Sequence, residues 1–142
     1  MITRTGLISV VLALALAGCG GGGMPDTVSG PARQVTSPDE IRLAVGEEVR
    51  VDGLLRIGFT GVPGDSRCPA SVICIWQGDA AVEIHYGLGQ GPSYPDTLHT
   101  TLDPKSASFA GYRITLLEVG PYPYTTDPIP MDEYEIRVRV ER

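Results

Sequence analysis

The side chains that could carry out chemistry in this 142-residue chain are three cysteines and two histidines, set among seventeen acidic residues. The cysteines are Cys19, Cys68 and Cys74, and the histidines are His85 and His99. Structural zinc sites use closely spaced ligand pairs, whereas the two histidines lie fourteen residues apart. Redox-active cysteines usually lie three positions apart at a helix start, whereas Cys68 and Cys74 lie six apart. We therefore expect no metal site and no cofactor.

Catalytic motifs are also missing from the sequence. The chain has no Gly-x-Ser-x-Gly elbow, no His-Glu-x-x-His motif and no phosphate-binding loop. Nothing singles out one carboxylate pair among its nine Asp and eight Glu residues. The formal charge of -6 argues against a protein that binds nucleic acid through its phosphates. We assign no catalytic residue and expect a protein that is not an enzyme.

The amino terminus has the pattern of an export signal. Arg4 precedes an apolar run over residues 6–18 that ends at Cys19. A helix of this length rises only about 20 Å, too little to cross a hydrocarbon core of about 30 Å, which is typical of a signal peptide. The segment Leu16-Ala17-Gly18-Cys19 resembles the lipobox of bacterial lipoproteins. That resemblance implies cleavage before Cys19, attachment of diacylglycerol to its sulfur and, usually, acylation of the new amino terminus.

The lipobox resemblance implies a location in the bacterial cell envelope. Cys19 would anchor the protein to a lipid bilayer, with the rest of the chain facing the periplasm or the exterior. The non-acidic Gly20 resembles the class sorted to the outer membrane in a Gram-negative cell. We expect a signal peptide over residues 1–18 and a flexible tether over 19–38, which is rich in Gly, Pro, Ser and Thr. The remaining residues, 39–142, have the length of a single domain.

Beyond residue 39, apolar residues alternate with polar ones, as expected for strands with one buried face. The clearest case is the last stretch, where Ile136, Val138 and Val140 alternate with Arg and Glu. Similar alternation is found over residues 41–45, 49–51, 55–59, 82–86, 98–102 and 112–116. Seven or eight short strands with Gly and Pro turns predict an all-β fold, an antiparallel β-sandwich of immunoglobulin-like or related type.

The densest run of distinctive residues lies between Asp65 and Gly78. Because lipid would occupy Cys19, the remaining thiols are Cys68 and Cys74, and an oxidising compartment favours a local disulfide between them. Gly78 is expected at a positive φ or a bulge. The pattern Asp-Ser-Arg-Cys-Pro followed by Cys-x-Trp-x-Gly resembles uncharacterised secreted and lipoprotein domains of bacteria. The resemblance implies an envelope location, a disulfide and a β-fold, and it carries no activity.

We favour a structural role over a functional one for each residue of this run. Arg67 is expected to pair at the surface with Asp65 or Asp79. Trp76 is expected to anchor the core from a strand over residues 73–76, since strand aromatics bury large areas. The run would then serve as a staple for a small secreted domain.

Two loops could nevertheless display contact residues on a rigid sandwich. One covers residues 61–72, with Asp65 and Arg67 and with Trp76 close behind it. The other covers residues 121–130, where Tyr122 and Tyr124 alternate with prolines. The leading interpretation is a non-enzymatic binding or structural module with an envelope protein as partner. A protease-inhibitor-like domain is the alternative, and a small envelope hydrolase is a third interpretation.

Overall fold

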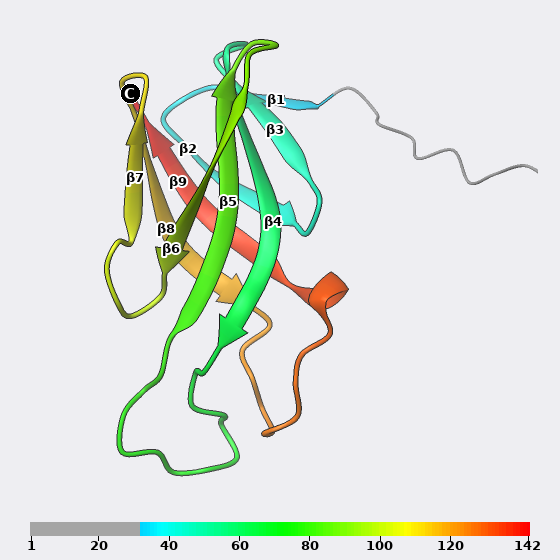
Figure 1. The fold of residues 1–142 in the computed structure, drawn as a ribbon, viewed down its shortest axis with the longest axis vertical. Helices are drawn as coiled ribbons and strands as arrows, with labels where there is room; N and C mark the ends of the chain where they lie inside the picture. Colours follow the sequence, from blue (N-terminus) through cyan, green and yellow to red (C-terminus); the bar gives the residue numbers. More distant parts are fainter. Residues whose placement is uncertain (1–31) are drawn as a thin grey trace, which may run out of the picture.

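Residues 32–142 are described by a computed structural model, and they form an almost entirely β structure (Figure 1). The expected signal peptide, Cys19 and most of the expected tether lie outside these residues. The strands, in chain order, are β1 Arg33–Val35, β2 Asp39–Ala44, β3 Glu48–Val51, β4 Leu55–Asp65, β5 Ala80–Leu88, β6 Ser93–His99, β7 Ser106–Phe109, β8 Tyr112–Gly120 and β9 Glu135–Glu141. A single 3-10 turn, η1 Met131–Glu133, precedes β9 within the described range. In this part of the chain, no helix has the length and apolar character needed to cross a membrane.

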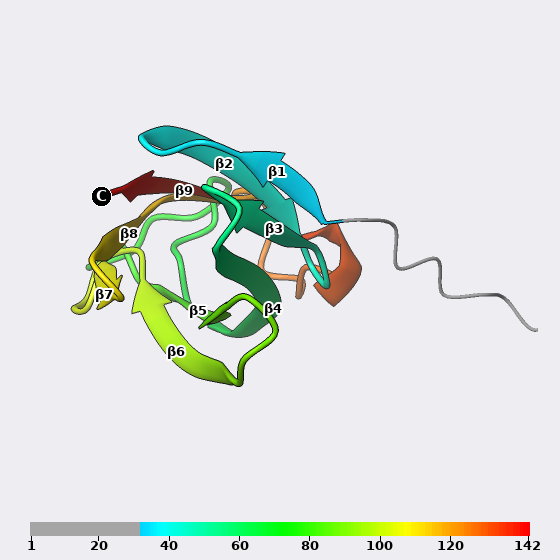
Figure 2. The same ribbon diagram turned by 90° about the horizontal axis from the view of Figure 1, so that it is seen from above.

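The strands pack as two sheets, which confirms the all-β sandwich predicted from the sequence (Figure 2). One sheet has the order β1-β3-β4-β5-β6, and the other has the order β2-β9-β8-β7. Their pairings are antiparallel except for the parallel pair β1 and β3. Consecutive strands are neighbours from β3 to β6 and again from β7 to β9, and β2 pairs with β9. The chain therefore follows a meander around the sandwich, which differs from the Greek key of immunoglobulin domains.

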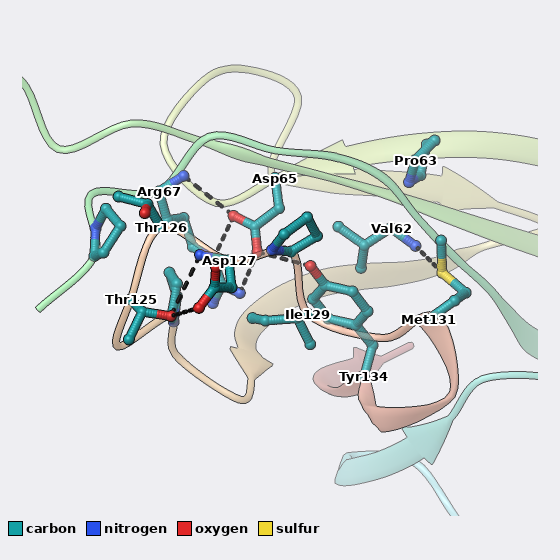
Figure 3. A pocket seen from close by; sticks show the side chains of 13 residues that line it. Val62, Pro63, Asp65, Arg67, Thr125, Thr126, Asp127, Ile129, Met131 and Tyr134 are labelled. Carbon is teal, nitrogen blue, oxygen red and sulfur yellow. Dashed lines mark hydrogen bonds and ion pairs between the residues drawn. The ribbon is translucent and has the colours of Figure 1, made fainter.

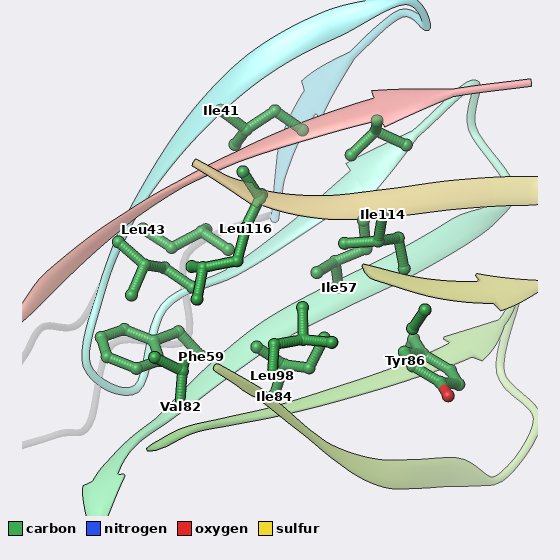
Figure 4. Close-up of a cluster of buried hydrophobic side chains, with 14 of the residues drawn as sticks. Ile41, Leu43, Ile57, Phe59, Val82, Ile84, Tyr86, Leu98, Ile114 and Leu116 are labelled. Carbon is green, nitrogen blue, oxygen red and sulfur yellow. The ribbon is translucent and has the colours of Figure 1, made fainter. Parts of the chain in front are cut away.

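The core lies between the two sheets and is supplied by the alternation that the sequence displays (Figure 4). In β9, Ile136, Val138 and Val140 are fully buried, while Arg139 reaches solvent on the outer face. Fully burying an apolar side chain of this size stabilises a fold by about 1.5–3 kcal/mol. The labelled core residues of Figure 4 are Ile41, Leu43, Ile57, Phe59, Val82, Ile84, Tyr86, Leu98, Ile114 and Leu116.

The sheet begins earlier in the chain than expected. Strand β1 lies within residues 19–38, the range assigned to the tether, and its Val35 is opposite Val51 of β3. The Val35 carbonyl also accepts a hydrogen bond from the Asp52 amide, at 2.9 Å. A strand of three residues is too short to show a period of two, so no alternation in the sequence marks it.

Candidate functional site

The long β4–β5 connection is a loop closed by a disulfide, and we call residues 66–79 the disulfide loop. The Cys68–Cys74 bond predicted from the sequence is present. At the base of the loop, the Ser66 amide donates to the Asp79 carbonyl at 2.7 Å. Gly78 has a φ of +73°, and a Cβ there would overlap the Ser66 carbonyl, so this turn requires glycine. The positive φ expected for Gly78 is confirmed.

The predicted strand over residues 73–76 is wrong, because these residues belong to the loop and have no strand partner. Trp76 is consequently not a core anchor: its exposed fraction is 52%. Ile73 and Ile75 are fully exposed, at 103% and 106%. The loop expected over residues 61–72 is displaced as well, since β4 continues to Asp65.

An ion pair beneath the disulfide loop holds it in place. Arg67 pairs with Asp65 as expected, with an Nη2–Oδ2 distance of 2.6 Å, but the pair is buried rather than at the surface. The side chains of Arg67 and Asp65 are only 6% and 12% exposed. The Arg67 guanidinium also donates to the carbonyls of Val119, at 2.6 Å, and Pro121, at 2.9 Å. Arg67 therefore ties the end of β4 to the end of β8, fifty residues further along the chain.

Asp65 is the hub of this arrangement. Its carboxylate accepts hydrogen bonds from the Arg67 backbone and side chain and from the Tyr134 hydroxyl, at 2.9 Å. Burial alone would raise the pKa of Asp65, and these donors more than offset it, so its pKa lies below the usual range. Burial and the hydrogen bond to Asp65 raise the pKa of Tyr134 to about 12. Asp65 is thus held as a carboxylate and Tyr134 as a neutral donor.

The residues 121–130 form the second expected contact loop, which we call the Pro/Tyr loop, and it lies directly against the first. The amides of Ala70 and Ser71 donate to the carbonyls of Pro123 and Tyr124, each at 3.0 Å. The Tyr122 hydroxyl donates to the Cys68 carbonyl at 2.9 Å. Both loops lie at the same end of the sandwich, the lower end in Figure 1. The structure therefore joins into one surface two loops that the sequence presented separately.

A second buried carboxylate closes the other side of the disulfide loop. Asp79 accepts hydrogen bonds from His99 Nδ1 at 2.6 Å and from the Thr101 amide at 2.8 Å. Burial tends to raise the pKa of Asp79, while the bonds from His99 and the backbone amides outweigh that effect and lower it. His99 is half-buried against Asp79. Residues 32–142 contain no group of three His, Cys, Asp or Glu side chains able to hold a metal ion.

A cavity of about 300 Å³ lies between the two loops (Figure 3). Its wall includes the buried pair Asp65 and Arg67, the Tyr134 ring and Met131. The remainder is Asp127 together with proline, threonine and aliphatic side chains, namely Val62, Pro63, Pro69, Pro123, Thr125, Thr126, Pro128 and Ile129. Asp65 and Arg67 in the wall already have partners within the protein, and Asp127 accepts a hydrogen bond from the Thr125 hydroxyl, so structural contacts frame the cavity.

The residues singled out from the sequence fall into two groups. Asp65 and Arg67 are buried supports, whereas Trp76, Tyr122 and Tyr124 are exposed on the joined loops, Tyr122 at 59% and Tyr124 at 72%. The sequence did not predict that Ile73 and Ile75 are exposed. One feature that could have indicated an apolar outer surface is that residues 68–78 contain no charged side chain.

Comparisons with known proteins add no relative: no family model, no curated protein and no solved structure matches this chain.

Proposed function

We propose that this protein is a lipoprotein of the bacterial cell envelope whose β-sandwich is a non-enzymatic contact module. The chain would be anchored through acylated Cys19 and face the periplasm or the exterior, on the outer membrane in a Gram-negative cell. Support for the anchor is the Leu16-Ala17-Gly18-Cys19 sequence after an apolar run. The observation that carries the contact role is the joining of the disulfide and Pro/Tyr loops into one surface with exposed apolar side chains.

The chemistry of the cavity favours contact over catalysis. A catalytic acid in such a cavity would need a carboxyl pKa raised toward neutrality. The pKa of Asp65 is shifted in the opposite direction, and its oxygens are occupied by Arg67 and Tyr134. These groups hold two loops together, which is the structural use of an ion pair.

A protease inhibitor remains the second candidate, because a disulfide-closed segment with fully exposed Ile73 and Ile75 resembles a loop offered to a cleft. The purified protein would then slow at least one envelope protease in a stoichiometric titration. A panel of such proteases that stays fully active at excess protein would remove this candidate.

The anchor and the contact surface have separate tests. Growth with a labelled fatty acid should label the protein, and replacing Cys19 by Ser should abolish the label. For the surface, a photo-crosslinking residue at Ile75 should give a defined product in living cells, whether with a protein or with lipid. The same residue at Ser108, which is exposed on β7 away from the joined loops, should give none. Equal products from both positions would contradict the contact role.

A further inference from the structure

The two most exposed apolar side chains of the described chain, Ile73 and Ile75, project from the disulfide loop. Together with their neighbours Val72 and Trp76 they form what we call the apolar tip. The exposed fractions of Val72, Ile73, Ile75 and Trp76 are 43%, 103%, 106% and 52%. A value near 100% means that neither isoleucine rests against any part of the protein. Residues 68–78 carry no charge, so the tip has no charged side chain of its own.

We propose that the apolar tip inserts into the interfacial layer of an uncharged lipid surface. This inference rests on the proposed function, since it assigns an occupant to the same contact surface. Trp and Tyr side chains concentrate at membrane interfaces, where their rings lie at headgroup level. Here Trp76 belongs to the tip, and Tyr122 and Tyr124 lie on the loop hydrogen-bonded beside it.

The shape of the tip favours lipid over a protein partner. Fully projecting isoleucines need a matching pocket on a protein, whereas a fluid bilayer accommodates separate side chains without one. The irregular backbone of the disulfide loop limits how deeply the tip can insert into a bilayer, because unpaired backbone groups cannot enter the hydrocarbon region. Insertion therefore involves the side chains of the tip and stops at the interface.

The surrounding charges favour an uncharged surface. Asp127 is exposed on the Pro/Tyr loop, at the same end of the sandwich as the tip, and Asp132 and Glu133 are exposed just after that loop. A second copy of the chain bound at the tip would bring a second Asp127 to the same end, and anionic lipid would place like charge near all three acidic groups. Both arrangements are unfavourable, whereas a zwitterionic surface imposes no such penalty.

The loop is already ordered for insertion. Its backbone is fixed before any contact forms by the Cys68–Cys74 disulfide, by the buried Arg67 and by two backbone hydrogen bonds to the Pro/Tyr loop. Insertion therefore avoids most of the entropy cost of ordering a flexible segment.

The anchored chain could reach its own bilayer with the tip. Strand β1 lies beside β3, whose Val49 pairs with Ile57 of β4, and Asp65 lies eight positions further along β4 than Ile57. That distance is about 26 Å along a strand. The thirteen positions from Cys19 to residue 32 span up to about 43 Å when extended, which is longer than the distance to Asp65, beyond which the tip projects.

Trp76 is the only tryptophan of the chain, so its fluorescence reports on the tip alone. The full-length lipidated protein is reconstituted into phosphatidylcholine vesicles, with or without bromine on the lipid acyl chains. Insertion predicts blue-shifted emission that brominated lipid quenches. Vesicles containing phosphatidylglycerol should give less quenching, and added salt should restore it.

Polar substitution of the tip supplies the matched comparison. Each of Ile73→Ser and Ile75→Ser should shift the docking equilibrium by about tenfold toward the free tip, and the double variant by about a hundredfold. Because both side chains are fully exposed, neither change removes a core contact. Leu54→Ser, at an exposed residue of the β3–β4 turn, should leave the quenching unchanged.

Three results would overturn the lipid assignment. One is red-shifted, unquenched Trp76 emission in the reconstituted protein. Another is a blue shift that ignores brominated lipid and grows with protein density, which would identify a second copy of the chain as the occupant. The third is a protein product, without lipid, from the crosslinker at Ile75; that result would leave the proposed contact module standing. A Cys19 that carries no lipid in the intact mass would instead contradict the anchor, independently of the tip.

Discussion

Removing the Arg67 side chain tests whether the buried ion pair holds the joined loops. In Arg67→Met the aliphatic stem is preserved, and the Asp65 carboxylate, 12% exposed, loses its charged partner. Breaking a buried pair by removing one member costs about 3–5 kcal/mol. Because Asp65 keeps the Tyr134 hydrogen bond and some access to water, we expect the lower end, about 3 kcal/mol. A domain of this size has about 5–15 kcal/mol of stability, so the variant should still fold.

Urea denaturation followed by far-ultraviolet circular dichroism measures this loss. The matched control is Arg42→Met, which removes the exposed pair with Glu135, where the side chains are 63% and 48% exposed. Exposed pairs contribute little, so the control should lie close to the parent. Asp65→Asn combined with Arg67→Met should be less destabilised than the sum of the single changes, because no lone charge is left buried.

The pH dependence gives an independent reading of the same pair. Asp65 has a lowered pKa in the folded state, so its contribution is present above the unfolded value of 3.8 and is lost as pH falls through the folded value. Arg67→Met should reduce this acid-side dependence, while Arg42→Met should retain it. Equal stability losses in the two Met variants would refute the structural role assigned to Arg67.

Three further predictions follow from the same part of the molecule. Replacing Cys68 and Cys74 by Ser should lower the unfolding free energy, measured by urea denaturation, by about 2 kcal/mol, because a closed loop of seven residues is released. On reduction, the intact mass of the oxidised parent should increase by two hydrogens. Gly78→Ala should cost at least about 1 kcal/mol in the same assay, because alanine is strained at a φ of +73° and its Cβ meets the Ser66 carbonyl; Gly46→Ala, with open space around it, should cost less. Tyr134 should ionise near pH 12 by ultraviolet absorbance; since its folded pKa is raised, the stability it contributes is complete below pH 10 and lost as pH rises toward 12. Ionisation of Tyr134 at its usual pH of 10 would contradict its bond to Asp65.

The sequence predicted the sheets because each strand has one dry face. In β9, three apolar residues at a spacing of two can be buried together only in an extended chain, and the structure buries all three. The disulfide was also predictable, since it joins residues six apart in the same loop.

The error at residues 73–76 has a physical cause. Ile73 and Ile75 are two residues apart, the spacing of one strand face, and the neighbouring Trp76 suggested burial. Hydrophobic pattern predicts where apolar residues would be buried if the backbone allows it. The backbone here is fixed by contacts to the Pro/Tyr loop, some fifty residues away, which no local pattern contains.

Separation along the chain also explains why Asp65 could be predicted as a partner of Arg67, whereas the other contacts of Arg67 could not. The aspartate is two residues away, whereas the carbonyls of Val119 and Pro121 come from the other sheet's end. Tyr134, which directly precedes β9, was not singled out from the sequence. Its hydroxyl reaches Asp65 because β9 begins beside the joined loops.

The exposure of the apolar tip is itself a consequence of these constraints. In a flexible loop, side chains such as Ile73 and Ile75 would fold back onto the protein, because removing their surface from water is favourable. Here the disulfide, the Arg67 contacts and the left-handed turn at Gly78 hold the backbone away from the sandwich. The charged groups of the loop, Arg67 and Asp79, are turned inward to provide that restraint, which leaves an uncharged outer surface. Releasing the restraints should therefore bury the isoleucines against the domain and remove the surface on which the contact role depends.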